Sequence, residues 1–457
     1  MSHAPLPDAS EGTRAIVTLV TELHHMTTQT GAQPRRPTHP NVVLVMLLCV
    51  YIFNFVDRQI LSILAAPIQA DLDLSDGQMG ALGGIAFALL YSTLAVPLAA
   101  LADRTSRSKV IAVSLIVWSI FTALCGLAQS FWHIFLARLG VGVGEAGGVA
   151  PSYALIGEYF PSSRRAFALS IYSLGIPLGS AAGVMAGGYI AATIDWRLAF
   201  IAVGLGGVLL APIFKLLVRD RLPAAGQEPR PSTAPPLRET AALLARKPSF
   251  WFLSFGAAMS SMTGYGIAFW LPSFLQRSFG FSLVEASWFF GALLLLGGVA
   301  GILLGGWLGD KLGGTNRAFY AWLPGIAYFV GAPLFALGIS SSEASFAFLL
   351  LLIPQALSYV WLGPVLSAVQ HLVAPPARSM ASALFLLINN LIGLGGGIYA
   401  LGALSDGLAP IYGEEALRYS MLYALGLYVV GAALMGLAGR SLPRDWVPEP
   451  QPPSLAS

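Results

Sequence analysis

Leu101-Ala102-Asp103-Arg104, followed by Thr105-Ser106-Arg107-Ser108-Lys109, is a short polar stretch between two long apolar ones. A related stretch, Leu308-Gly309-Asp310-Lys311 followed by Leu312-Gly313-Gly314, occurs about half a chain later. An acid, a base and turn-forming residues at the same place in both halves of an apolar chain indicate a duplicated membrane protein. In such proteins the functional site tends to lie between the two repeats.

The composition places the chain in a lipid environment. Of its 457 residues, 56% are hydrophobic and 10% are charged, and the mean hydropathy is +0.72, whereas a soluble globular chain carries about 25% charged residues. The net charge of +3 is too small to indicate a nucleic acid partner. Cys49 and Cys125 lie inside apolar runs and the six histidines form no metal-binding pattern, so we expect neither a metal nor a cofactor.

Hydropathy predicts the fold. Beyond residue 40 we count twelve apolar stretches that reach the roughly 20 residues a membrane-crossing helix needs. A proline-rich stretch, 220–248, predicts a flexible linker between two halves. The prediction is an all-α membrane protein with twelve transmembrane helices in two pseudo-symmetric six-helix bundles. Its predicted parts are a disordered cytoplasmic tail (1–40), an N-terminal bundle (41–219), a cytoplasmic linker (220–248), a C-terminal bundle (249–440) and a second cytoplasmic tail (441–457).

The placement of charges supports this span count. With an even number of spans, both tails and alternate loops share one side, and 20 of the 25 Lys and Arg residues fall there. The other side holds Arg197, Arg277 and Arg418 against nine acidic residues. The positive-inside rule then puts both termini in the cytoplasm. We therefore expect a multi-pass protein of the cell membrane, either a plasma membrane or a bacterial inner membrane.

Four ionisable residues remain inside the predicted spans: Asp57, Arg58, Arg138 and Glu145. An ionisable residue near the bilayer centre costs roughly 2.5–3.5 kcal/mol, which favours a functional role. Arg138 and Glu145 are two helical turns apart, hence on nearly the same face. The four charges cancel, so we expect one buried network facing a water-filled cavity. The alternative is a permanent ion pair between the first and fourth helices, although buried pairs stabilise poorly compared with apolar packing.

Glycine spacing predicts close helix packing. Small residues that recur every four positions let membrane helices approach each other closely. Two such ridges occur, one in each half, and we expect the two halves to contact each other along them. The ridges are Gly175, Gly179, Gly183 and Gly187 in the fifth span, and Gly297, Gly301, Gly305 and Gly309 in the eighth.

Two further spans are candidates for bending gates, because glycine or proline inside a spanning helix is tolerated where other groups satisfy the backbone. The seventh span contains Gly264-Tyr265-Gly266 and then Trp270, and the eleventh contains Asn389-Asn390 before a glycine cluster. We expect Tyr265, Trp270, Asn389 and Asn390 to contribute to substrate binding. Aromatic residues in a membrane bundle also serve as simple packing.

The residues also carry a resemblance. The stretch 99–109 resembles the signature G-x-L-A-D-R-x-G-R-K of the major facilitator superfamily, with Ala99 and Ser106 at two of its glycine positions. Arg138 with Gly142 and Gly144 resembles that superfamily's motif in the fourth helix. More narrowly, the chain is similar to the Spinster branch in six stretches: Asn54-Phe-Val-Asp57-Arg58, Gly142-Val-Gly144-Glu145-Ala, 154–165, 171–179, 389–395 and 402–406.

The resemblance covers about residues 41–440, and it implies the major facilitator fold. Animal members of the Spinster branch export sphingosine-1-phosphate or lysophospholipids. The resemblance therefore implies transport of an anionic or zwitterionic amphiphile. It also implies that Asp57, Arg58, Arg138 and Glu145 are the coupling and headgroup-binding residues. Pro177, which follows Gly175 by two residues, differs from the Gly-Pro pair of the drug/proton antiporter motif and argues against a multidrug exporter.

The resulting hypothesis is a proton-coupled secondary transporter that works by alternating access, with its site between the halves. In it, Glu145 takes up and releases the proton while Arg138 stabilises its carboxylate. Arg58 is the second candidate to bind a phosphate or carboxylate, because a guanidinium suits both. Asp57 would bind a cation or modulate Arg58.

The repeated polar stretch is expected to lock one conformation. Asp103 would cap a neighbouring helix N-terminus, and Arg107 would pair with Glu158. Arg104, Asp310 and Lys311 complete the residues that we assign to this lock.

Several alternatives stay open. Within transport, the substrate could be a small organic anion or another hydrophobic solute, and transport could be uncoupled. A membrane-embedded enzyme would need a nucleophile–base pair or a metal cluster at membrane depth, and the sequence offers neither, so we expect no enzymatic activity. A transport-dead sensor would carry a sizeable output domain. The expected partners are a small-molecule or lipid substrate, protons and membrane lipids, and we expect the protein to work as a monomer.

Overall fold

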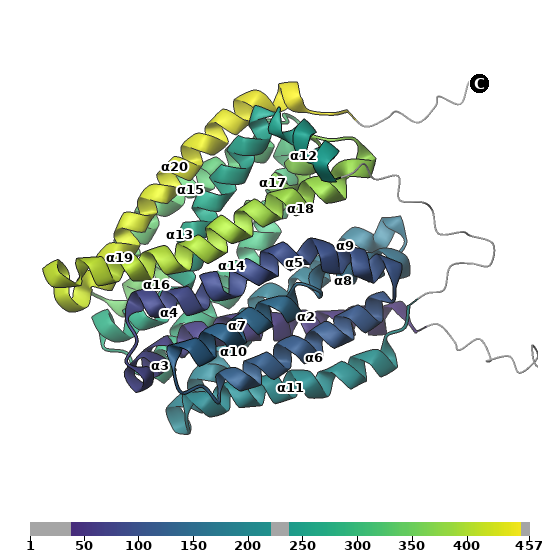
Figure 1. The fold of residues 1–457 in the computed structure, drawn as a ribbon. Coiled ribbons are helices and arrows are strands. Elements are labelled where there is room, and N and C mark those ends of the chain that lie inside the picture. Colours follow the sequence, from purple (N-terminus) through teal and green to yellow (C-terminus); the bar gives the residue numbers. More distant parts are fainter. Residues whose placement is uncertain (1–37, 221–236, 449–457) are drawn as a thin grey trace, which may run out of the picture. The chain divides into compact units, whose positions relative to one another are not determined.

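The computed structural model describes residues 38–220 and 237–448, and these residues form helices and no strands (Figure 1). The chain from Pro40 onward forms one compact unit. Most of the predicted N-terminal tail, the proline-rich part of the linker (221–236) and the last nine residues (449–457) lie outside the described residues.

The N-terminal half contains six membrane-crossing segments, several of which are built from two consecutive helices. The second crossing is interrupted at Gly84, the fourth at 146–148 and the fifth at Leu174. The helices are α2 (Pro40–Ile63), α3 (Ala65–Leu72), α4 (Asp76–Gly83), α5 (Ile85–Arg104), α6 (Arg107–Cys125), α7 (Phe131–Glu145), α8 (Val149–Tyr159), α9 (Ser162–Ser173), α10 (Gly175–Thr193) and α11 (Trp196–Leu217).

The C-terminal half follows the same plan, with one irregular crossing. That crossing consists of α18 (Arg378–Ile388), a π-helical segment η2 (Asn389–Gly396) and α19 (Gly397–Tyr412). The other elements are α12 (Leu237–Ala245), α13 (Pro248–Phe279), α14 (Leu283–Gly313), α15 (Phe319–Ile339), α16 (Ala344–Leu357), α17 (Leu362–Gln370), the short turns η1 (Pro375–Ala377) and η3 (Gly413–Glu415), and α20 (Ala416–Asp445).

Nine segments of the described residues are long and apolar enough to cross a membrane by length and hydropathy alone. The last of these, Pro375–Asp445, includes both α19 and α20, whereas α7–α8 and α13 fall outside the nine. The arrangement is consistent with twelve crossings. We call the side on which α2 begins and α11 and α20 end the tail side, and the opposite one the far side (Figure 1).

Two predicted boundaries were wrong. The linker was predicted to be flexible through residue 248, but α12 forms within it. Leu237 to Ala245 contains neither proline nor glycine, because the other prolines lie before it and Pro248 begins α13. The C-terminal tail was predicted from residue 441, but α20 continues to Asp445. The next residue, Trp446, stacks on His371 and Tyr320, with ring centroids 4.3 and 5.5 Å away, so the start of this tail is packed against the bundle.

The prediction that the glycine ridges join the two halves was also wrong. A Cβ at Gly179 would lie 2.4 Å from the Ile52 carbonyl of α2, and one at Gly301 would lie 2.1 Å from the Ala356 carbonyl of α16. Each ridge therefore packs inside its own half. The spacing of glycines along a helix indicates a close contact but not which neighbour makes it.

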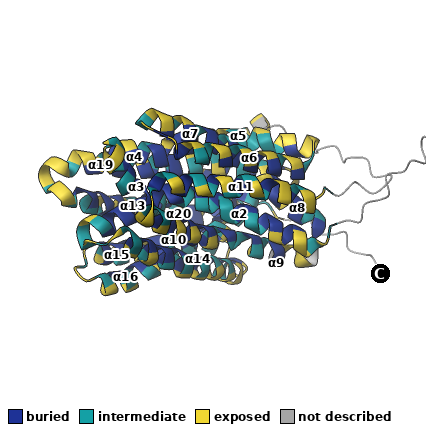
Figure 2. Ribbon diagram, turned by 90° about the horizontal axis from the view of Figure 1, so that it is seen from below, coloured by how far each residue is buried: buried dark blue, intermediate teal, exposed yellow. Residues whose placement is uncertain are grey.

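The halves nevertheless meet along the same two helices, through other positions. A Cβ at Gly188 of α10 would lie within 1.7 Å of the Ser287 hydroxyl of α14, and one at Gly298 of α14 would lie 2.9 Å from Pro177. All four of these residues are buried, and exposed positions lie on the outer faces of the bundle (Figure 2). Large apolar side chains on outward faces, such as Leu209, Leu303 and Phe329, are exposed, as expected for surfaces that face lipid.

Candidate functional site

The two charged residues of α7 owe their position to its glycines. A Cβ at Gly142 would lie 2.5 Å from the Phe87 carbonyl of α5, and one at Gly144 would lie 2.4 Å from the Trp118 amide of α6. Only glycine permits these backbone approaches. They bring Arg138 and Glu145 into the middle of the N-terminal half, where both side chains are buried. The helix ends at Glu145.

The four predicted membrane charges meet in one cluster, but their pairing differs from the prediction. Glu145 Oε2 accepts a hydrogen bond of 2.7 Å from Arg58 Nε, and not from Arg138. Arg138 Nη1 lies 3.7 Å from Asp57 Oδ1 instead. We expected Arg138 to stabilise the Glu145 carboxylate, but the hydrogen bond to Glu145 comes from Arg58 of α2. Both acid–base contacts join α2 to α7, the first and fourth crossings, as in the alternative of an ion pair between these helices.

This cluster is only partly hydrogen-bonded. Asp57, Arg138 and Glu145 are at most 2% exposed, yet one carboxylate oxygen of each acid has no hydrogen-bond partner within the described residues, and neither do Nε and Nη1 of Arg138. Buried polar atoms are nearly always paired, and leaving one unpaired costs about 1–3 kcal/mol, more for a charged group. The cluster therefore has unused hydrogen-bonding capacity within the described residues.

Aromatic rings surround the Arg58 guanidinium. Its central carbon lies 5.1 Å from the ring centroid of Phe55, 4.9 Å from that of Phe87 and 4.5 Å from that of Tyr91. Arg138 lies over the other side of the site, 5.0 Å from the Phe87 centroid. Rings at these distances attract a cation, so they hold both guanidinium groups in place.

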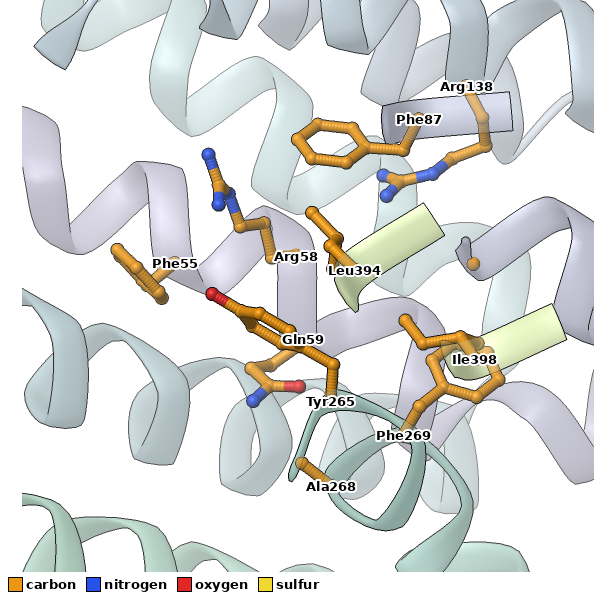
Figure 3. A pocket seen from close by; sticks show the side chains of 11 residues that line it. Phe55, Arg58, Gln59, Phe87, Arg138, Tyr265, Ala268, Phe269, Leu394 and Ile398 are labelled. Atoms are coloured by element: carbon orange, nitrogen blue, oxygen red, sulfur yellow. The ribbon is translucent and has the colours of Figure 1, made fainter. Parts of the chain in front are cut away.

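A cavity of about 450 Å³, including the space at its mouth, lies beside this cluster (Figure 3). Both halves line it, and the C-terminal half contributes apolar side chains and the Tyr265 hydroxyl. Its lining residues are Phe55, Arg58, Gln59, Gly83, Phe87 and Arg138 from the N-terminal half, and Tyr265, Ala268, Phe269, Leu394 and Ile398 from the C-terminal half. The cavity thus offers two cations at one end and an apolar wall at the other.

Tyr265 lies where the sequence predicted, but three other predicted residues do not line this cavity. The Trp270 indole is fully buried and donates to the Ile398 carbonyl at 3.0 Å. Asn389 accepts a hydrogen bond of 2.9 Å from Ser261 inside the C-terminal half. Asn390 is the second residue of the π-helical segment and lies outside the lining as well. Trp270, Asn389 and Asn390, which we expected to contribute to substrate binding, thus lie outside the lining of this cavity.

Part of the predicted lock is assembled on the tail side. Arg107 donates to Asp103 at 2.7 Å and also contacts Glu158 of α8. The Asp103 side chain is 62% exposed, and it pairs with Arg107 in place of the predicted helix N-terminus. The remaining lock residues are all exposed: Arg104 at the end of α5, and Asp310 and Lys311 near the end of α14.

The end of α11 is anchored to the start of α6 by a residue that the sequence did not single out. Ser106 caps α6 by accepting the Lys109 amide, so a glycine is not needed at this turn. The Asp220 carboxylate accepts the Ser108 amide at 2.9 Å and contacts both serine hydroxyls. Burial raises the pKa of Asp220, but these hydrogen bonds outweigh burial and hold the pKa below its ordinary value.

A second cluster, also missed from the sequence, joins the halves on the far side. The Asp76 carboxylate receives two hydrogen bonds of 2.7 Å from Arg277 of α13 and one of 2.7 Å from Ser405 of α19. The Asp406 carboxylate in turn accepts the amides of Asp76 and Gly77 at 3.0 and 2.8 Å. The Ser75 capping box predicts where α4 starts, but no local signal reveals a partner 330 residues away.

The helical fold and a central cavity lined by both halves define the class of the protein, which is a multi-pass membrane transporter. Residues 47–397 match the family model of the Major Facilitator Superfamily. Two curated proteins are similar to this chain over most of its length. An "MFS-type efflux pump" of Mycolicibacterium smegmatis is 34% identical over 88% of this chain and 94% of its own length. "Protein spinster homolog 1" of Bos taurus is 30% identical over 88% of this chain and 81% of its own.

A solved structure supports the same branch. A bacterial homologue of the human lysosomal transporter Spinster, in an inward-facing and unoccupied conformation, superposes with a TM-score of 0.78 at 30% identity. The match covers 93% of this chain and all of that one. The chain belongs to the Major Facilitator Superfamily, in its Spinster branch.

Proposed function

We propose that this protein is a proton-coupled transporter of an anionic or zwitterionic amphiphile, such as a lysolipid or a sphingosine-1-phosphate-like molecule, that works by alternating access. The observation that carries the proposal is the partly paired cluster of two acids and two arginines beside a cavity whose remaining lining is mostly apolar. The guanidinium groups suit a phosphate or carboxylate headgroup, and the apolar wall suits a hydrocarbon chain.

The contacts suggest how a proton and a headgroup exchange. While Glu145 is ionised, it holds Arg58 Nε. Protonation of Glu145 removes its charge and frees Arg58 to bind an anionic headgroup. The proton and the substrate then either occupy the site together or leave it one after the other. Arg138 and Asp57 form the neighbouring pair and would respond in the same way. Arg138 is therefore proposed as a second headgroup ligand, and Asp57 as a second protonation site.

Two features support a state of the transporter that is open to the tail side. Far-side contacts of Asp76 and Asp406 hold the halves together, while Asp103 on the tail side is exposed. Arg107, Asp103 and Glu158 would lock a conformation together with Arg104, Asp310 and Lys311. We propose that the tail side is cytoplasmic, that the protein resides in a plasma or inner membrane, and that it works as a monomer.

The test uses proteoliposomes with an imposed pH gradient and lysophosphatidylglycerol as the probe. We expect Glu145→Gln to lose pH-driven uptake and probe-evoked proton flux, because the amide neither takes up nor releases a proton. Glu343→Gln, which alters an exposed glutamate at the start of α16, is the matched control and should behave as wild type. Wild-type coupling in Glu145→Gln would disprove the proton role.

Efflux of other hydrophobic solutes is a second candidate, favoured by the similarity to the mycobacterial efflux pump and by the mostly apolar cavity wall. A headgroup-dependent carrier should lose transport of lysophosphatidylglycerol on Arg58→Gln and Arg138→Gln. A carrier of hydrophobic cations should transport ethidium in wild type and tolerate both substitutions. Measuring both probes in the same vesicles separates the two functions.

A further inference from the structure

Thr122 of α6 contacts Asp57 and is not among the residues that line the cavity beside Arg58 and Arg138. Its side chain is 1% exposed and its hydroxyl contacts Asp57 Oδ2. The same hydroxyl oxygen lies 2.9 Å from the carbonyl of Trp118, one turn earlier in α6. Both contacts were found only from the structure, because threonine is common in membrane helices and often bonds to the carbonyl four residues before it.

One hydroxyl hydrogen cannot serve both acceptors at once. A threonine hydroxyl has a single donor hydrogen and two acceptor lone pairs. When Asp57 is ionised, its carboxylate is the stronger acceptor, so the hydrogen points to Oδ2. When Oδ2 carries a proton, Asp57 becomes the donor, and the Thr122 hydrogen turns to the Trp118 carbonyl. In that exchange Asp57 gains one proton from water, and the covalent O–H bond of Thr122 stays intact. Its donated hydrogen bond moves from Oδ2 to the Trp118 carbonyl, and its oxygen accepts the new one from Asp57.

We propose that Thr122 is a positioning residue that keeps Asp57 hydrogen-bonded in both of its protonation states by redirecting its hydroxyl hydrogen. The inference rests on the proposed proton coupling and deepens it. Oδ1 of Asp57 has no hydrogen-bond partner within the described residues. Without a group that both donates and accepts at Oδ2, either the ionised or the protonated carboxyl would have no hydrogen bond there.

The other groups that face Asp57 do not take the hydrogen-bonding role proposed for Thr122. Arg138 of α7 and Arg58 of α2 have no acceptor atom, and Arg138 is 3.7 Å away. Glu145 of α7 and Cys125 of α6 are also close enough to interact electrostatically with Asp57. The small cavity beyond Asp57 is lined by Phe53, Trp118, Ser119, Thr122, Val203 and Gly204. Thr122 is therefore the residue whose hydroxyl both donates and accepts at Oδ2.

The test reads the protonation of Asp57 directly, in the full-length protein without a ligand. Infrared difference spectra over a pH titration report the C=O stretch of a protonated carboxyl, and Asp57→Asn identifies the Asp57 band. Thr122→Val keeps the shape of the side chain but removes the hydroxyl. The charge-assisted bond to the carboxylate is lost, and it is stronger than the neutral one, so the titration midpoint should rise by about one pH unit.

Two variants control for packing. Thr122→Ser keeps the hydroxyl and should titrate as wild type with the same band position. Ser119→Ala removes the neighbouring hydroxyl of the same small cavity and should leave the midpoint unchanged. Equal midpoints in wild type and Thr122→Val would overturn the inference, as would a Thr122→Ser protein that behaves like the valine variant.

The outcomes separate this inference from the proposed function. If the Asp57 band titrates in wild type and Thr122→Val does not move it, only the role of Thr122 fails. If no Asp57 band titrates at all, the role of Thr122 and the protonation of Asp57 both fail. Proton coupling through Glu145 is then judged by its own proteoliposome experiment.

Discussion

At the scale of single residues, the question is whether Arg58 and Glu145 are paired for stability or for function. A hydrogen bond of 2.7 Å joins the two side chains. The Glu145 side chain is fully buried, and the Arg58 side chain is 14% exposed. Removing one partner of a buried pair leaves an uncompensated charge, at a cost of about 3–5 kcal/mol, whereas replacing both by apolar residues is often neutral or stabilising. The pair can therefore be tested by comparing single and double substitutions.

We expect Arg58→Met to lower the unfolding midpoint of the detergent-solubilised protein markedly, because Glu145 stays buried without its partner. Arg58→Met combined with Glu145→Met should recover most of that loss. Transport of lysophosphatidylglycerol should be absent in both variants. Thermal unfolding and uptake are measured on the same preparations. A double variant as unstable as the single one would instead make the pair a permanent structural link.

Residue-level reasoning from the sequence found the four charges but not their partners. Asp57, Arg58, Arg138 and Glu145 stand out because ionisable residues are rare in apolar stretches. Which acid meets which base depends on how α2 and α7 are rotated and spaced, and that is a tertiary property. Thr122 gave no signal for the same reason, since its importance comes entirely from its neighbour on α2.

At the scale of helices, the start of α6 depends on a carboxylate from outside the helix. Ser106 accepts the amide of Lys109, and Asp220 accepts that of Ser108, so two of the free amides of the first turn are satisfied. Asp220 also places a negative charge at the positive end of the helix dipole. The end of α11 is thereby fixed to the beginning of α6.

Asp220→Ala should lower the free energy of unfolding by about 1 kcal/mol at neutral pH, the usual effect of losing a cap. The folded pKa of Asp220 is below its ordinary value, so its contribution is full above the unfolded pKa of about 3.9 and is lost as pH falls through the folded pKa. The difference from wild type should therefore be constant above about pH 5 and shrink below about pH 4.

The matched control is Asp195→Ala. Asp195 holds the N-cap position of α11, but its side chain makes no cap hydrogen bond, so its removal should change stability much less. Chemical denaturation from pH 7 to pH 3 measures both variants. A wild-type advantage over Asp220→Ala that persists unchanged at pH 3 would contradict the assigned role.

Helix positions were largely predictable from the sequence, because a run of about 20 apolar residues has few alternatives in a membrane. The internal irregularities were not. The predicted eleventh span contained the Asn389-Asn390 pair and its glycine cluster, but the π-helical geometry of Asn389–Gly396 appears only in the structure. Segments of this kind frequently occur at functional sites, and Leu394 of this one lines the cavity.

At the scale of the whole molecule, the two halves are joined on the far side by carboxylates that cross between them. Asp406 of α19 accepts two amides at the start of α4, and Asp76 of α4 accepts both arms of Arg277. Charge-assisted and bidentate bonds are the stronger ones. This seam must open if the site is to face the far side, so its strength biases the equilibrium between the two states.

The repeated stretch 99–109 and its partner 306–314 predicted two related halves, and the family and the fold are confirmed. How the halves contact each other was not predictable. The glycine ridges pack inside each half, while the contact between α10 and α14 uses Gly188 and Gly298. Duplication conserves the packing within a repeat, whereas the interface between repeats has no counterpart in either half alone.

Asp406→Ala should weaken the far-side seam. Two hydrogen bonds from amides to a charged group are lost, each worth about 1.5–3 kcal/mol, so the ratio of far-side-open to closed molecules should rise at least tenfold. Hydrogen–deuterium exchange should then accelerate together in the start of α4, the end of α13 and α19. Exchange in α18 on the tail side should not accelerate. Asp71→Ala is the control, because it breaks an ion pair with Arg197 inside one half on the same side. Faster exchange confined to Asp76 and Gly77 would show that only a local cap is lost and that Asp406 does not hold the two halves together.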